Sequence, residues 1–88
     1  MSMQAIAAAF GVTDIGANRK FILVMLANYA DSDGQCWPSQ EMLGAATELT
    51  DRTVRTALKE LEEKGLIARQ HRCGAGGVRI SDLITLLI

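Results

Sequence analysis

The sequence is short of aromatic residues, histidine and cysteine, and these shortages limit how the core is built and which sites the chain can hold. With 5% aromatic residues, the core must be built from Leu, Ile, Val, Ala and Met side chains. One histidine and two widely separated cysteines, Cys36 and Cys73, supply neither the number nor the spacing of ligands that a zinc site needs. The longest uninterrupted apolar run, residues 21–27, is far shorter than a membrane span. We therefore expect a cytoplasmic protein with reduced thiols, no metal and no membrane contact.

The sequence also lacks a catalytic constellation. A single histidine leaves no convergent Ser/His/Asp set, and the glycine-rich segment at 73–77 precedes a strand-like run, whereas a phosphate-binding loop precedes a helix. The run DSDG at 31–34 begins like a calcium loop, but Met42 stands where the glutamate at the last loop position would be needed. We therefore expect no enzymatic activity, no cofactor and no small-molecule ligand.

Positive charge is scarce in the first half of the chain and concentrated in the second. The whole chain has a formal net charge of −1. Residues 1–48 hold two basic side chains against five acidic ones, a net charge of −3, whereas residues 49–88 hold seven against five, a net charge of +2. Because a polyanionic partner responds to the local field, this asymmetry favours a binding surface in the C-terminal half.

A length of 88 residues with 49% apolar and 22% charged side chains indicates one small folded domain. Residues 1–17 are expected to form an N-terminal arm, helical or extended, in which Met3, Ile6 and Phe10 make an apolar stripe. That stripe must pack on the domain itself or on a second copy, so a homodimer is left open, with residues 83–88 as another candidate interface. Residues 18–88 are expected to form the domain proper.

The stretch LTDRTVRTALKELEEKGLI at 49–67 predicts the helix around which the domain is organised. Thr50 is a suitable N-cap, and Gly65 suits the left-handed position that follows the last turn of many helices. Apolar residues recur between them at helical spacing and predict a buried face, which consists of Val54, Ala57, Leu58 and Leu61. The opposite face is polar and, near its N-terminus, basic; it consists of Arg52, Thr56, Lys59 and Glu63, with Arg55 on its flank.

Two shorter helices are expected before this one. Asn18 can cap a largely buried helix that runs to about Tyr29. Ser39 directly follows Pro38 and can cap a second helix that runs to about Ala46. A short connector then leads into the helix at 49–67, so the last two helices make a helix-turn-helix pair.

Strand-like runs flank the glycine-rich segment at 73–77. Residues 66–72 and 78–81 interleave apolar and polar side chains, which predicts a β-hairpin with a long tip. An apolar piece at 35–37 is long enough for a short strand. Residues 83–88 are left open between strand and helix, because leucine and isoleucine suit both.

The order helix, short strand, helix, turn, helix, hairpin resembles the winged helix-turn-helix domains of phage and prophage proteins, in the HTH_36 and phage replication-protein groups. The resemblance covers residues 18–83 and implies a mainly α fold with a small β-hairpin, in which a three-helix core carries a wing. It rests on the order and spacing of five short motifs: CWPS at 36–39, RTV at 52–54, LEEKGLI at 61–67, GGVR at 76–79 and SDL at 81–83.

The resemblance also implies where DNA would bind. Members of this group place the N-terminal half of the third helix in the major groove, and their wing meets phosphate or the minor groove. A guanidinium group offers paired donors that match guanine or a phosphate. The implied DNA-binding residues are Arg52, Thr53, Arg55, Thr56 and Lys59 of the helix, and Arg69, Arg72 and Arg79 of the wing.

Several of these residues have a purely structural alternative. Arg55 can belong to a charge pattern along a solvated helix face, and Thr53 can complete the helix cap. Trp37 is expected to be a core or packing residue rather than a base-stacking platform. His71 is expected to be an exposed strand residue, with no partner evident for a pH switch.

The sequence thus predicts a double-stranded DNA-binding winged helix that acts as a transcriptional regulator or as a replication-origin-binding module. The absence of a further domain after Ile88 favours the regulator, unless the chain is part of a longer protein. The alternative is a winged helix for protein–protein contact, which would use the acidic side chains at 60–63. A contiguous positive surface on the third helix and wing would favour DNA, and an interrupted one would favour a protein partner.

Overall fold

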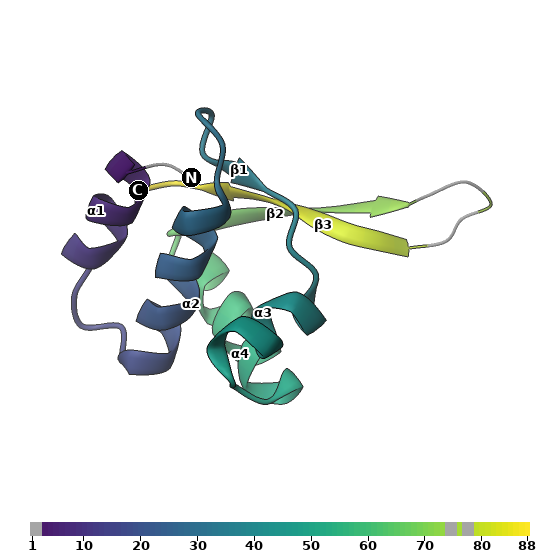
Figure 1. Cartoon of the computed structure of the whole chain (residues 1–88), viewed down its shortest axis with the longest axis horizontal. Helices are drawn as coiled ribbons and strands as arrows, with labels where there is room; N and C mark the ends of the chain where they lie inside the picture. Colours follow the sequence, from purple (N-terminus) through teal and green to yellow (C-terminus); the bar gives the residue numbers. More distant parts are fainter. Residues whose placement is uncertain (1–2, 74–75, 77–78) are drawn as a thin grey trace.

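The computed structural model describes residues 3–73, 76 and 79–88. Within them the chain forms four helices and one three-stranded antiparallel sheet, with strand order β1-β3-β2 (Figure 1). The helices gather on one side of the sheet, and β2 and β3 project beyond them as a wing (Figure 1). The elements are α1 (Met3–Gly11), α2 (Ala17–Tyr29), β1 (Gln35–Cys36), α3 (Gln40–Thr47), α4 (Asp51–Glu63), β2 (Ile67–Cys73) and β3 (Arg79–Leu86). This is the winged helix-turn-helix architecture that the sequence predicts.

Most of the expected N-terminal arm forms helix α1, which packs against α2. Ala9 is fully buried in the core, and Ile6 packs against the same core from its edge. Met3 and Phe10 point into solvent instead. The predicted apolar stripe is therefore divided between the core and the surface.

Helix α2 begins after a glycine and not after the predicted asparagine cap. Gly16 occupies the N-cap position with φ of 89°, and no side chain caps the helix there. Asn18 lies exposed inside the first turn, so its prediction as the cap was wrong. A glycine reaches this left-handed φ without the steric cost that other residues carry, and it sets the entry angle of the helix. The buried face of α2 consists of Ile22, Leu23, Leu26 and Ala27.

The helix-turn-helix pair has the two side-chain caps that the sequence predicts. Ser39 Oγ accepts a hydrogen bond from the backbone N–H of Met42 at 2.9 Å, and Thr50 Oγ1 accepts one from Thr53 at 3.2 Å. Each bond satisfies a backbone donor that the first turn of a helix leaves unpaired. The chain turns between the helices at Glu48, which has a left-handed φ of 60°.

Replacing Thr50 with alanine is expected to lower the free energy of unfolding by about 1 kcal/mol, because the N–H of Thr53 loses its acceptor. Urea unfolding followed by circular dichroism measures the change. Thr50→Ser is the matched control, since it keeps the hydroxyl. Equal stability of the alanine and serine variants would contradict the assigned cap.

Helix α4 buries the face that its periodicity predicts, namely Val54, Ala57, Leu58 and Leu61. Gly65 has the predicted left-handed conformation, with φ of 74°. Helix α3 buries Leu43 and Thr47, while Met42 and Ala46 are exposed.

The wing is a long hairpin whose inner strand is β3. Strand β3 pairs with both neighbours, with Arg69 and Cys36 each opposite Ile84. An irregularity interrupts the β2–β3 register between Gln70 and Arg72. The segment that was open between strand and helix continues as strand to Leu86, and Ile84 within it is buried in the core.

Cys36 is a buried, free thiol on the edge strand β1. Burial, with a smaller contribution from the nearby charge of Asp31, raises the pKa of Cys36 to about 11. The thiol therefore stays protonated and poorly nucleophilic at neutral pH. This agrees with the reduced state expected for Cys36. The side chain of Cys73 lies outside the described part of the structure.

None of the helices in the described ranges is long and apolar enough to cross a membrane.

Candidate nucleic-acid interface

The outer ridge of α4 presents basic and hydroxyl groups to solvent. Arg52, Thr56 and Lys59 are all exposed and follow one another along the helix, with Glu63 one turn further on. Thr53 is half-buried beside them and bonds to the Thr50 hydroxyl at 2.9 Å, as the capping alternative proposed. The predicted residues of α4 thus form a continuous surface over its first two and a half turns.

A cleft of about 360 Å³ separates α4 from the wing. Arg55 of α4 and Arg69 of β2 line it from opposite sides, with Leu58 at its floor. Ser39 and Gln40, at the start of α3, line it as well. Sequence reasoning used Ser39 only as a cap and did not connect α3 to the site. The signal was present, because the free N–H groups at a helix start attract anions.

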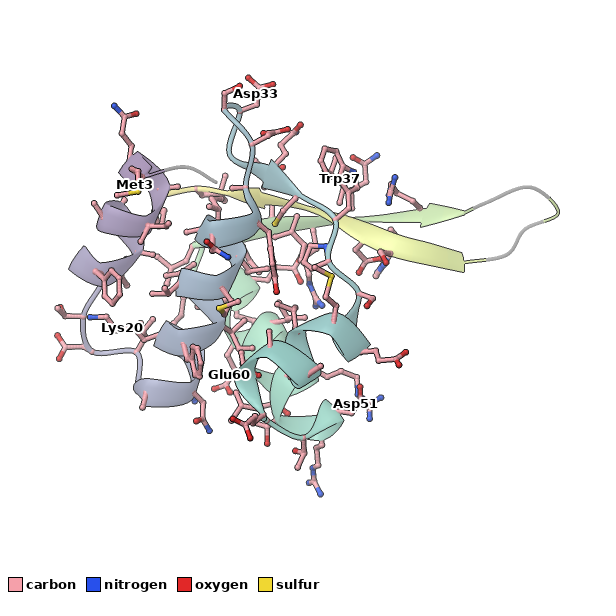
Figure 2. The ribbon with its side chains drawn as sticks, in the orientation of Figure 1. Met3, Lys20, Asp33, Trp37, Asp51 and Glu60 are labelled. Carbon is pink, nitrogen blue, oxygen red and sulfur yellow. The ribbon has the colours of Figure 1, made fainter. Side chains whose placement is uncertain are left out.

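Arg19 fixes the flank of α4 that faces α2. Its Nη2 donates to Glu60 Oε2 at 2.6 Å, and its Nη1 donates to the backbone carbonyl of Ile15 at 2.8 Å. In Figure 2, Glu60 lies between α4 and α2. A second hollow, of about 270 Å³, opens on this flank, between Arg52, Thr56 and the start of α2. Sequence reasoning gave Arg19 no role, because nothing local links residues 41 positions apart.

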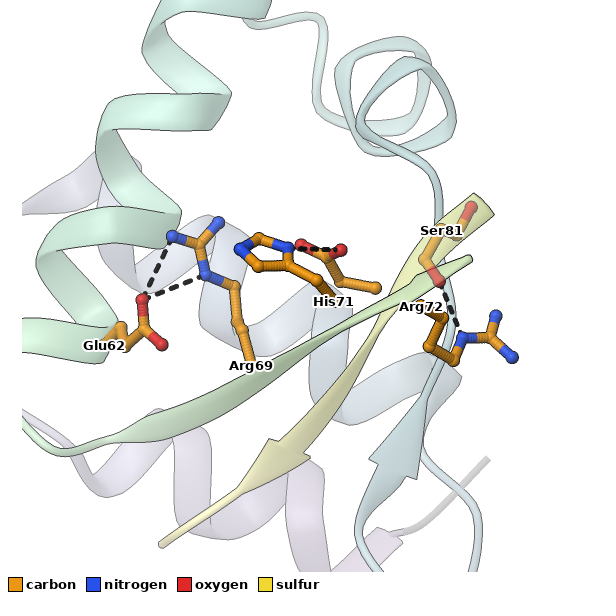
Figure 3. Close-up of polar contacts among 6 residues, drawn as sticks. Glu62, Arg69, His71, Arg72 and Ser81 are labelled. Carbon is orange, nitrogen blue, oxygen red and sulfur yellow. Dashed lines mark hydrogen bonds and ion pairs between the residues drawn. The ribbon is translucent and has the colours of Figure 1, made fainter. Parts of the chain in front are cut away.

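The wing carries its basic residues on both faces. Arg69 donates through Nε and Nη2 to Glu62 Oε1 at 3.2 and 3.1 Å, and its side chain is only 15% exposed (Figure 3).

His71 is exposed as predicted, yet its Nδ1 lies 2.9 Å from Asp82 Oδ1, a partner that the sequence did not reveal. Of Arg79, the third predicted wing residue, the structure places the backbone at the start of β3.

Arg72 reaches across the other side of the hairpin. Its Nε donates to the backbone carbonyl of Ser81 at 2.8 Å, and its guanidinium carbon lies 6.0 Å from the centre of the Trp37 ring. Trp37 is 45% exposed. Trp37 is therefore a packing residue, as expected, but it packs at the surface and not in the core.

Three of the four acids of α4 lie on its flanks and pair with arginines. Asp51 pairs with Arg55 at 3.1 Å, and both side chains are largely exposed. Glu60 and Glu62 are engaged by Arg19 and Arg69. No acid consequently interrupts the basic ridge before Glu63. The paired acids partly neutralise the arginines on the two flanks of the ridge. The Asp51–Arg55 pair is exposed and therefore weak, so a phosphate can displace its carboxylate.

Comparison with known proteins is consistent with this geometry. Residues 13–67, from the loop before α2 to the start of β2, match the HTH_36 family, described as a helix-turn-helix domain. The chain is 37% identical over 51 residues to protein YmfN of Escherichia coli (strain K12), a match that covers 58% of this chain. The matched region spans 11% of the length of that protein. No solved structure matches the chain.

Proposed function

Because the chain belongs to the helix-turn-helix domain family, we propose that it binds double-stranded DNA through the N-terminal half of α4 and the β2–β3 wing. One observation carries the proposal. The exposed ridge of Arg52, Thr56 and Lys59 runs beside a cleft whose two walls carry Arg55 and Arg69. A major groove is wide enough for a helix such as α4, and the groove walls are rows of phosphates. The ridge would meet base edges while the cleft and wing met the backbone.

The chemistry of the ridge suits both tasks. Arg52 is exposed at the start of α4 and has the geometry to reach a guanine edge or a phosphate. Thr56 can donate to a phosphate or touch a thymine methyl, and Lys59 is placed to act as a phosphate contact. None of these groups needs to move charge or break a bond, so we propose binding without catalysis.

The biological setting is also part of the proposal. The resemblance to phage and prophage domains supports a phage-derived DNA-binding module that works in the cytoplasm. It would either regulate transcription or mark a replication origin, since both roles require the same recognition surface. The partner is double-stranded DNA in either case.

Selection of bound sequences from random duplexes at 50 and 200 mM salt, both conditions typical of such assays, tests the proposal. We expect enrichment of a defined sequence at both salt concentrations and much weaker total binding at the higher one. Phosphate contacts release counterions, which is why affinity falls steeply with salt. Failure to recover any duplex at the lower salt concentration would refute the proposal.

Replacing Glu62 with glutamine is expected to raise the affinity for duplex DNA about threefold to tenfold. The change frees the Arg69 guanidinium from its carboxylate and removes one negative charge beside it. Titration of a labelled duplex measures it by fluorescence anisotropy. Glu63→Gln is the matched control, because it removes the same charge one residue further along α4. An equal gain from both variants would mean that net charge, and not release of Arg69, is responsible.

The protein–protein alternative receives less support from these contacts. It would need the acids of α4 as a free surface, yet Glu60 and Glu62 are held by arginines of the same chain. A homodimer stays a prediction. The exposed Met3 and Phe10 of α1 supply an apolar surface for it, and sedimentation equilibrium with and without Phe10→Ser would test it.

A further inference from the structure

Trp37 and Arg72 make a contact that neither the fold nor the proposed function requires. Trp37 is the chain's single tryptophan and is nearly half exposed, which is a large apolar surface to leave in water. Figure 2 shows its ring on the side of the sheet turned away from α3 and α4. Nothing in the helical core depends on that ring, so its position calls for another explanation.

The backbone at Trp37 is held firmly from both sides. Cys36, before it, is buried and pairs with Ile84 of β3, and Pro38, after it, is buried at the entry to α3. Because both neighbouring residues are buried, the backbone at Trp37 has little freedom to move. Trp37 is therefore a fixed platform beside the wing.

Arg72 is oriented by that platform through contacts that involve no carboxylate. Its Nε donates to the Ser81 carbonyl, and the indole ring lies under the guanidinium as a cation–π partner. Neither contact involves a carboxylate. Arg55 and Arg69, by contrast, are paired with Asp51 and Glu62. Arg72 thus combines a defined orientation with described contacts to a carbonyl and a ring only, and its two Nη groups are the paired donors that suit phosphate oxygens.

The place of Arg72 on the hairpin matters as much as its charge. In Figure 3 it lies on the other side of the hairpin from Arg69, which faces α4. A wing that enters a minor groove has one phosphate backbone on each side, because that groove is only about 6 Å wide. One face of the wing would then offer Arg69 to one strand, and the other would offer Arg72 to the opposite strand.

We infer that Trp37 is a positioning residue for DNA binding, which holds the Arg72 guanidinium toward a phosphate on the strand opposite to the one beside Arg69. The inference rests on the proposed function, since it concerns the same duplex. It adds a contact on the outer face of the wing and gives a role to an exposed aromatic residue that touches no DNA base itself. The ring acts through Arg72, by restricting its rotamers before DNA arrives.

Affinity and its salt dependence in paired variants test the inference. Trp37→Leu and Arg72→Ala are each expected to weaken binding of a labelled mixed-sequence duplex about tenfold at low salt. Each should also reduce the slope of log affinity against log salt by about 1, the change expected for one lost phosphate contact. The double variant should bind no more weakly than Arg72→Ala alone. Trp37→Phe keeps an aromatic ring beside Arg72, so it should retain most of the native affinity. A purely structural role for Trp37 would not lower the salt slope.

Tryptophan emission gives a second readout that needs no change at Trp37. Adding duplex to the native protein should alter the fluorescence, and the same addition to Arg72→Ala, at a concentration that saturates binding, should alter it much less. A native-like affinity and slope for Trp37→Leu, or additive losses in the double variant, would overturn the inference while leaving the proposed function intact. Absence of duplex binding by the native protein would overturn both.

Discussion

Replacing Leu61 with alanine is expected to lower the free energy of unfolding by about 2–5 kcal/mol. Leu61 is fully buried where α4 packs on α2 and β2, so the shorter side chain leaves a cavity that several elements line. A small domain has a total stability of only about 5–15 kcal/mol, which makes this a large fraction of it. Chemical denaturation followed by circular dichroism gives the value.

Leu87→Ala is the matched control for that experiment. The same side chain is removed, but Leu87 is 55% exposed just after the end of β3, so the expected change is within about 0.5 kcal/mol. A loss of less than about 1 kcal/mol for Leu61→Ala would show that α4 is not anchored in the core as described. The recognition surface would then lack the rigid support that the proposed function assumes.

The double variant Arg52→Ala with Arg55→Ala is expected to reduce affinity for duplex DNA by a factor of about 100 or more. One arginine lies on the outer ridge of α4 and the other on the wall of the cleft, so each is expected to lose a separate charged contact. A bidentate arginine contact contributes about 1–3 kcal/mol, and two such losses multiply in the binding constant. Anisotropy titrations with a labelled duplex at low salt measure the loss.

Lys20→Ala controls for the general loss of positive charge. Lys20 lies near the start of α2, on the side of the molecule away from Asp51 and the start of α4 (Figure 2). Its removal is expected to change affinity less than threefold, because a charge beyond the Debye length of about 10 Å is largely screened. Comparable losses for Lys20→Ala and the double variant would mean that the protein binds DNA without a defined surface.

The sequence predicted the features that follow from local pattern. The buried face of α4 came from apolar residues at helical spacing, and the caps at Ser39 and Thr50 came from hydroxyl groups at helix starts. Gly65 marked the end of α4 by its tolerance of a left-handed conformation. Each of these signals lies within a few residues of the structure that it specifies, which is why one sequence was sufficient.

Features that depend on tertiary contact were missed or misplaced. Asn18 was predicted as a cap from residue type alone, whereas Gly16 begins the helix because the loop geometry demands a positive φ. The pairs of Arg19 with Glu60 and of Arg69 with Glu62 join segments whose proximity only the fold decides. Residues 83–86 became strand because β3 is paired on both sides, a condition that outweighs their ambiguous propensity.

Those ion pairs change the physical picture of the interface. The sequence suggested basic residues against intruding acids, with the balance unresolved. In the structure, Asp51 and Glu62 occupy the same guanidinium groups that a phosphate would need. Under the proposed function, DNA would have to compete with these intramolecular carboxylates. That competition would lower the affinity for nonspecific DNA, and recognition would depend more on Arg52 and Lys59.

Amide chemical-shift mapping of ¹⁵N-labelled protein with a duplex recovered by selection tests the central claim most directly. We expect the largest changes in residues 51–59 of α4, with further changes at the start of α3 and in residues 69–72 of the wing. Helix α1 and the far side of α2 should change little. Shifts concentrated on α1 or the C-terminal end of β3, with α4 unchanged, would contradict the assignment of α4 as the recognition helix.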